Sequence, residues 1–190
     1  TAGNWVPIGT SSTKFAGTFN GNENTISGLY CVQTDEENAG LFGRVTSTGK
    51  IMGVTLRDSY FSNTKIRVAG IAAVNYGTIS DCYVASVING TGCNGGVVGH
   101  NSGTIIRCGN SINVNSSLSD TGGVAGYNNG TIQYCYNYGA LEGRSGANLG
   151  GIVGRNEGTI KDCFNYGKCN GGTTDIGGIV GQNVKGTIAD

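Results

Sequence analysis

The chain has 190 residues with 36 glycines, one proline, 12 basic and 12 acidic residues, and a formal net charge of zero. This composition excludes collagen, which needs abundant proline, and the hydrophobic fraction of 37% argues against a disordered linker. The balanced charge, without a lysine or arginine cluster, excludes nucleic acid as an expected partner. No apolar run reaches the roughly 18 residues that cross a bilayer, so the sequence predicts no transmembrane segment here.

Residues 1–68 match the later repeat only weakly. Gly40-Leu-Phe-Gly43, followed by Ile51 and Val54, has the pattern of a degenerate repeat unit. Terminal units of repeat proteins are often atypical because they cover the end of the core. We therefore expect 1–68 to form an N-terminal cap with degenerate coils, in which the larger apolar side chains cover the open end: Trp5, Phe15, Phe19 and Ile26.

Residues 69–190 repeat one glycine-rich unit with a period of about 27 residues. The unit reads GGIVGRNEGTIKDC from Gly150, and similar copies start at Ala69, Gly95, Gly122 and Gly177. The spacing from its first small residue to its cysteine is constant in the full copies, whereas the stretch after the cysteine varies. The constant half therefore predicts a stacked, hydrogen-bonded frame, and the variable half predicts a loop edge.

Each unit contains short β-prone pieces separated by an Asn-x-Gly turn, and it has neither leucine spacing nor a helical period. The sequence predicts an all-β fold, a right-handed parallel β-helix (β-solenoid) of about six or seven coils with three short strands per coil. We expect residues 1–190 to be a single solenoid domain. The absence of an initiator methionine leads us to expect a fragment of a longer chain.

Equal positions of successive coils stack in register, which predicts ladders of identical side chains. Stacked asparagine amides can bond to one another at a corner. A glycine column follows, where we expect φ > 0, and then an isoleucine column that we expect in the core. The asparagine column is Asn75, Asn101, Asn128, Asn156 and Asn183; the glycine column is Gly77, Gly103, Gly130, Gly158 and Gly186; the isoleucine column is Ile79, Ile105, Ile132, Ile160 and Ile188.

Four of the seven cysteines share one repeat position. In-register side chains on adjacent coils keep their Cβ atoms near 4.8 Å, wider than a relaxed disulfide prefers, so we expect buried free thiols. A metal or redox site is disfavoured because the chain has no CxxC pair. The sequence does not decide whether two of Cys31, Cys93 and Cys169 form a bridge. The ladder cysteines are Cys82, Cys108, Cys135 and Cys163.

Aromatic residues follow the last two ladder cysteines. Stacked rings usually stabilise a solenoid, but a row of exposed rings could also hold sugar rings or a protein partner. No catalytic, metal or cofactor site is predicted, because the acidic residues are sparse and the single histidine, His100, is expected at an outward position without a partner. The candidate ligand-binding rings are Tyr136, Tyr138, Phe164 and Tyr166.

Four N-terminal segments, Trp5-Val-Pro-Ile-Gly9, 15–21, 25–30 and 39–43, precede the GGIVGxNxGTI units in a fixed order. This combination covers nearly the whole chain and resembles GLUG-motif regions of bacterial surface and secreted proteins, including adhesin-like proteins and the part upstream of the catalytic domain in the immunoglobulin A1 protease family. The resemblance implies an extracellular, secreted or surface-attached location. The protease chemistry needs an HExxH helix, which this chain lacks.

We therefore expect a non-catalytic structural or adhesive module of a bacterial cell-surface or secreted protein. Its partner would be an unspecified surface protein or a glycan of host or bacterial origin. The alternative is a glycan-binding or carbohydrate-active module, because enzymes also use this architecture. A third hypothesis, ice binding, rests on one threonine column and is disfavoured because the flanking columns lack threonine.

Overall fold

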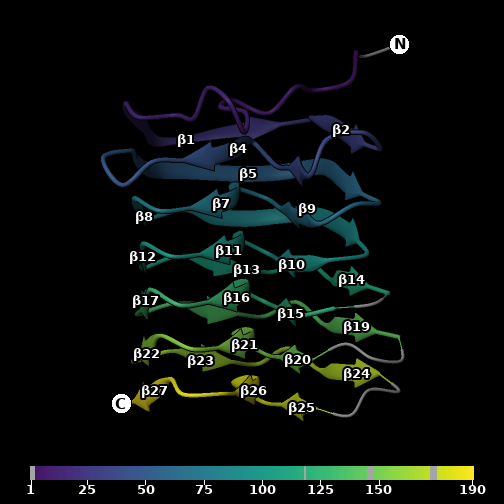
Figure 1. Ribbon diagram of the computed structural model, residues 1–190, viewed down its shortest axis with the longest axis vertical. Coiled ribbons are helices and arrows are strands. Elements are labelled where there is room, and N and C mark those ends of the chain that lie inside the picture. The colour runs from purple at the N-terminus through teal and green to yellow at the C-terminus, as the bar shows by residue number, and fades with distance from the viewer. Residues whose placement is uncertain (1–2, 118, 145–147, 172–174) are drawn as a thin grey trace.

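A computed structural model describes residues 3–117, 119–144, 148–171 and 175–190. The described chain winds into six stacked coils, topped at the N-terminal end by further chain (Figure 1). Every strand pairing among these residues is parallel, and no helix occurs in them. The predicted all-β parallel solenoid, with three strand positions per coil, is confirmed.

The first small sheet takes one short strand from each coil, in which small residues precede a tight turn. Added Cβ atoms on its glycines would meet the backbone that returns from this turn, for example Val98 O above Gly95. These collisions favour glycine from β10 onward, whereas Ala69 holds the equivalent position in β6. The strands are β3 (Asn38–Ala39), β6 (Arg67–Ala69), β10 (Cys93–Gly95), β15 (Thr121–Gly122), β20 (Leu149–Gly150) and β25 (Ile176–Gly177).

The second small sheet follows directly in each coil, and from the second coil onward its strands end at the asparagine corner. Its register pairs the corner asparagines of neighbouring coils, such as Asn101 with Asn128. The strands are β4 (Phe42–Val45), β7 (Ala72–Asn75), β11 (Val98–Asn101), β16 (Ala125–Asn128), β21 (Val153–Asn156) and β26 (Val180–Asn183).

The large sheet forms the third side of the coils and contains 15 strands. It starts with long strands and is divided into shorter pieces in the later coils. The strands are β1 (Thr18–Ser27), β2 (Tyr30–Gln33), β5 (Lys50–Asn63), β8 (Thr78–Ser80), β9 (Tyr83–Gly90), β12 (Thr104–Ile106), β13 (Gly109–Asn110), β14 (Val114–Ser116), β17 (Thr131–Gln133), β18 (Tyr136–Asn137), β19 (Leu141–Gly143), β22 (Thr159–Lys161), β23 (Phe164–Asn165), β24 (Cys169–Gly171) and β27 (Thr187–Ala189).

In the later coils the large sheet is divided at a bend just before the cysteine position. In the first coil Gly53 occupies this position with φ of 63°, and β5 runs through it unbroken. Later coils place residues other than glycine in the same left-handed region, which L-residues adopt at a cost of roughly 1–2 kcal/mol. These residues are Asp81 (φ 54°), Arg107 (50°), Tyr134 (54°) and Asp162 (50°).

The glycines after the asparagine corner are required for a different reason from the one predicted. Gly77, Gly103 and the later members do not have positive φ. A Cβ on Gly103 would instead meet the carbonyl oxygen of Gly77 in the preceding coil, and a Cβ on Gly130 would meet that of Gly103. Close approach of neighbouring coils, rather than backbone conformation, selects glycine in this column.

The core runs along the axis between the three sheets. Ile79, Ile105, Ile132 and Ile160 are buried, whereas Ile188 in the last coil is 47% exposed. At the N-terminal end, Trp5, Phe15, Phe19 and Ile26 are partly buried and pack against the core.

Candidate functional site

The asparagine corner is a continuous chain of side-chain amides. Asn101 Nδ2 donates to Asn128 Oδ1 at 2.8 Å, and the same bond joins the other neighbouring pairs from Asn75 to Asn183 at 2.8–2.9 Å. Each Oδ1 from Asn75 to Asn156 also accepts a hydrogen bond from the backbone N–H two residues later. The first four amides are fully buried, so this column stabilises the coils and is closed to ligands.

A second asparagine ladder was not predicted from the sequence. Asn110 Nδ2 donates to Asn137 Oδ1 at 2.8 Å, and Asn137 Nδ2 donates to Asn165 Oδ1 at 2.9 Å. Each amide also donates to a carbonyl two residues later in its own coil. The sequence signal for this ladder is the Cys-x-Asn spacing in three consecutive units.

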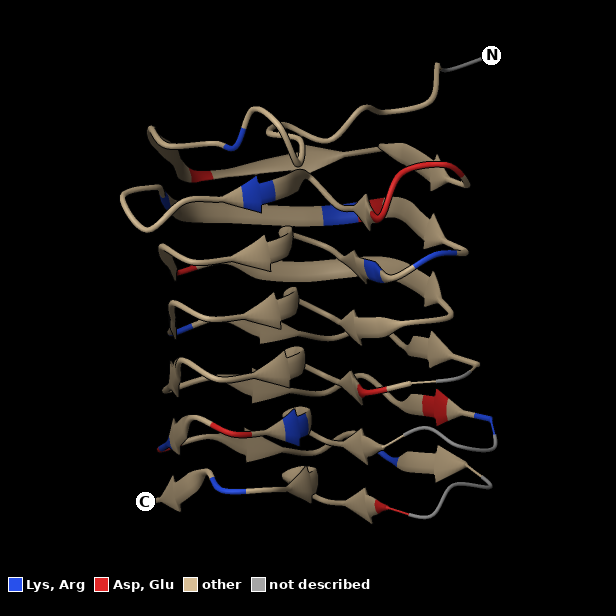
Figure 2. Ribbon diagram, viewed as in Figure 1, with Lys and Arg blue, Asp and Glu red and all other residues tan. Residues whose placement is uncertain are grey.

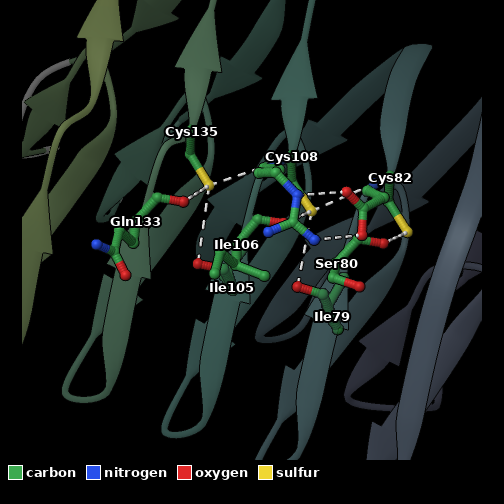
Figure 3. A network of polar contacts seen from close by, with 10 residues as sticks. Ile79, Ser80, Cys82, Ile105, Ile106, Cys108, Gln133 and Cys135 are labelled. Carbon is green, nitrogen blue, oxygen red and sulfur yellow. Dashed lines mark hydrogen bonds and ion pairs between the residues drawn. The ribbon is translucent and has the colours of Figure 1, made fainter.

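The four ladder cysteines are free thiols, and Figure 3 shows Cys82, Cys108 and Cys135 in neighbouring coils. The backbone N–H of Cys82 donates to Cys108 Sγ at 3.4 Å, and that of Cys108 donates to Cys135 Sγ at 3.5 Å. Each thiol in turn donates to the carbonyl two residues earlier in its own coil, at 3.1–3.3 Å. Burial raises the pKa of the Cys108 thiol well above its ordinary value, which keeps this thiol protonated and unreactive.

The three cysteines outside the ladder are also free thiols. They lie on different strands: Cys31 on β2, Cys93 on β10 and Cys169 on β24. Burial raises the pKa of all three thiols. Because all three are free thiols, no disulfide joins any two of them.

The aromatic candidates form two adjoining stacks on the outer face of the large sheet. Tyr136 stacks on Phe164 with centroids 5.6 Å apart, and Tyr138 stacks on Tyr166 at 5.4 Å with only 6° between the ring planes. The two stacks meet edge to face at 65–75°. The structure thus brings all four candidate rings together, but each stack turns ring faces toward each other and leaves fewer faces open than four separate rings would.

Tyr83 extends the first stack across a glycine. Its ring centroid lies 6.4 Å from that of Tyr136, although the intervening coil separates the two residues. A Cβ on Gly109 would collide with the Tyr136 ring, so Tyr136 leans over Gly109 toward Tyr83. The glycine therefore makes the aromatic contact possible.

His100 has partners that the sequence did not predict. It is half-buried on β11, contacts the Tyr127 ring edge to face at 4.7 Å between centroids, and bonds to Ser102 Oγ through Nε2 at 3.1 Å. Burial, together with Arg67 and Arg44, lowers the pKa of His100 to about 4. The Arg155 guanidinium covers Tyr127, 5.7 Å from the ring centroid. His100 is therefore not an isolated side chain but part of a column of packed surface residues.

Five carboxylates of the described residues form ion pairs: Glu37, Asp58, Asp81, Glu157 and Asp162. Asp81 accepts two hydrogen bonds from Arg107, at 2.6 and 2.9 Å, and this guanidinium holds the pKa of the Asp81 carboxyl below its usual range. No group of three or more His, Cys, Asp or Glu in the described chain could hold a metal ion. Charged residues are scattered over the coils without a continuous stripe of one sign (Figure 2).

No protein-family model matches the chain. Residues of the chain are 32% identical over 82 positions to a "Putative Gly-rich membrane protein" of Evansella cellulosilytica, and 33% identical over 98 positions to "Halomucin" of Haloquadratum walsbyi. These alignments cover 42% and 51% of this chain but only 10% and 1% of the two relatives.

The fold is also found in a solved structure. A crystal structure described as that of "a putative immunoglobulin A1 protease from Bacteroides ovatus" superposes with a TM-score of 0.81, covering 98% of this chain and 63% of that one. At 21% identity, this likeness shows the shared solenoid fold. The described residues include no helix long and apolar enough to span a bilayer.

Proposed function

We propose that this chain is a non-catalytic structural and adhesive module, of the GLUG-motif type, in a cell-surface or secreted bacterial protein. The observation that carries the proposal is that the repeated side chains are used in contacts between coils: asparagine amides bond to asparagine amides and thiols accept neighbouring N–H groups. Such a unit supplies a stiff rod whose outer face can vary without loss of the frame.

The relatives support the proposed location. One is named as a membrane protein and the other as a halomucin, and this chain corresponds to only a small part of each. A module that occupies a small part of long proteins is suited to a supporting or binding role within them. We propose an extracellular or surface-attached location and a surface protein or glycan as partner.

The experiment compares three versions of the parent protein displayed on cells: intact, with residues 1–190 deleted, and with these residues replaced by a flexible glycine-serine linker of the same length. Antibody binding to a tag beyond the module measures display, and counting attached cells measures adhesion. We expect both altered versions to lose attachment or tag exposure. Normal attachment together with normal display in the deletion version would refute the proposal.

Glycan binding is the second candidate function, and the exposed aromatic stacks are the observation that favours it. Tyr138, Phe164 and Tyr166 are 53%, 44% and 74% exposed. Flat side chains with a polar edge supply contact area for sugar rings and protein surfaces alike. A carbohydrate-cleaving activity has less support, because Asp81 is held in an ion pair with Arg107, and Asp162 lies three coils away.

A further inference from the structure

The outer face of the large sheet changes abruptly from small to aromatic residues along one column. Hydrogen bonds between coils place Ser111 beside Ala85, Tyr138 beside Ser111, and Tyr166 beside Tyr138. Arg57 begins the same column by pairing with Ala85. Two small side chains therefore lie between Arg57 and the tyrosine stack, which leaves a step on the surface of the rod.

Tyr138 forms the wall of this step. Tyr166 covers the ring face that points toward the C-terminal coil, with centroids 5.4 Å apart. The opposite face points toward Ser111, whose side chain is too small to cover a ring. Tyr138 accordingly remains 53% exposed even though it is stacked.

The flanks of the step supply polar and aromatic groups. On one side, Tyr136 leans over Gly109 and meets Tyr138 edge to face at 5.6 Å. On the other side lies the exposed Asn113, whose Oδ1 accepts the N–H of Ala140. Ser111 adds a hydroxyl at the floor. The surroundings thus combine one open ring face with neutral hydrogen-bonding groups.

The charges near the step favour a neutral ligand. Arg57 lies about 14 Å from Tyr138, three strand spacings along the rod, and pairs with Asp58 at 3.8 Å. A nucleotide would need a concentration of positive charge for its phosphates, and this face does not provide one. A sugar ring has an apolar C–H face that can stack on tyrosine and hydroxyls that can bond at its rim.

We propose that the step over Ser111 and Ala85 binds one neutral hexopyranose unit of a glycan, stacked on the free face of Tyr138. The site is shallow and open, so a single site buries little of its ligand and binds it weakly. The proposal rests on the glycan binding given above as the second candidate function, and it is independent of the structural role, which the rod could perform with the step unoccupied.

The test titrates the purified chain with cellohexaose, laminarihexaose, maltohexaose and a β-1,6-galactohexaose, while NMR follows the amide signals of Ser111 and Tyr138. We expect at least one oligosaccharide to shift these signals in a saturable way. The absence of a saturable shift with all four at millimolar concentration would overturn the proposal.

Three variants locate the site. Tyr138→Ala removes the stacking face, and Ser111→Tyr fills the step with a ring that continues the Tyr138–Tyr166 stack without disturbing the frame. Each substitution is expected to weaken binding at least tenfold. Urea unfolding of the Ser111→Tyr chain checks that a loss of binding is not due to unfolding.

Tyr166→Ala is the matched control, because it removes an exposed ring from the same column but leaves the face toward Ser111 intact. Binding within threefold of the unaltered chain is expected. Loss of binding in Tyr166→Ala together with unchanged binding in Ser111→Tyr would place the sugar elsewhere on the aromatic stacks and refute the assignment.

Discussion

The two ends of the solenoid differ in how far their apolar side chains are covered. At the N-terminal end, Phe15 and Phe19 pack on Phe42 with centroids 4.9 and 5.4 Å apart, and Phe42 is fully buried. At the C-terminal end, Ile176 and Ile188 are 45% and 47% exposed. The residue type alone therefore does not decide whether a side chain in a column is buried in the core. Each coil is stabilised by the neighbour that covers it.

The strongest test of this comparison uses one glycine column. A Cβ on Gly123 would meet the carbonyl oxygen of Gly151 and the Asn137 side chain, whereas a Cβ on Gly178 would meet no atom within 4 Å. We expect Gly123→Ala to lower the free energy of unfolding by about 3 kcal/mol, because a neighbouring backbone cannot move aside easily. Gly178→Ala should leave it unchanged or slightly raised. Urea unfolding measures both, and equal losses would show that the neighbouring coil does not matter.

The asparagine corner offers a second matched pair. Asn128 is fully buried and exchanges amide hydrogen bonds with coils on both sides, whereas Asn183 is exposed and accepts one bond from Asn156. Asn128→Ala leaves buried groups without partners and should cost about 2 kcal/mol of unfolding free energy, against less than about 1 kcal/mol for Asn183→Ala. The difference should appear as a larger drop in the urea midpoint for the interior variant. A ratio near one would contradict the account.

Acid should reveal the same contrast in the column of His100. Because the folded state holds the pKa of His100 at about 4, below the ordinary 6.5, the unfolded chain binds a proton more readily between these values. Stability contributed by neutral His100 is therefore complete above pH 6.5 and is lost as the pH falls toward 4. The free energy of unfolding should fall by about 1–2 kcal/mol, after allowance for the partial exposure of His100, and this acid-dependent loss should be absent from the His100→Gln chain.

A histidine moved to the end of this column supplies the comparison. Gln182 occupies the equivalent position in the last coil, where its amide lies 3.5 Å from the Asp175 carboxylate. In the double variant His100→Gln/Gln182→His, the histidine should titrate at or above pH 6.5, as measured by NMR. A pKa near 4 at both positions would mean that neighbouring coils do not cause the shift.

The smallest expected effect concerns the bend in the large sheet. Tyr134 adopts φ of 54°, a region that asparagine tolerates better than tyrosine. Tyr134→Asn should raise the free energy of unfolding by about 1 kcal/mol. Asp162→Asn, at the same column position with φ of 50°, should change it little because aspartate already tolerates this conformation. A destabilised Tyr134→Asn chain would show that the exposed ring contributes more than the backbone strain costs.

The sequence predicted the parallel solenoid and its register because the later coils repeat the same residue at several equivalent positions, although the first coil has Val45 where the second has Asn75. Asn101, Cys108 and Ile105 could each be placed beside their equivalents by counting alone. The frame was predictable because, when coils stack in register, residues that lie one repeat apart in the sequence come into contact in the structure.

Features that depend on how side chains lean were not predictable. Gly130 was expected to need positive φ, but close approach to Gly103 selects it. The aromatic positions could be counted, yet counting did not show that Tyr166 covers one face of Tyr138 while Ser111 leaves the other open. These properties depend on the distance between backbones and on ring orientation, which a repeat period does not contain.

Amide hydrogen exchange under native conditions tests most directly whether neighbouring coils stabilise each other. The N–H groups of Val124 and Ile152 donate to Ile152 and Ile179 of the following coils at 3.0 and 2.9 Å. We predict slow exchange at Val124, intermediate exchange at Ile152 and fast exchange at Ile179 in the last coil. Equal protection at all three amides would contradict the account, because it would mean that the solenoid opens only as a whole.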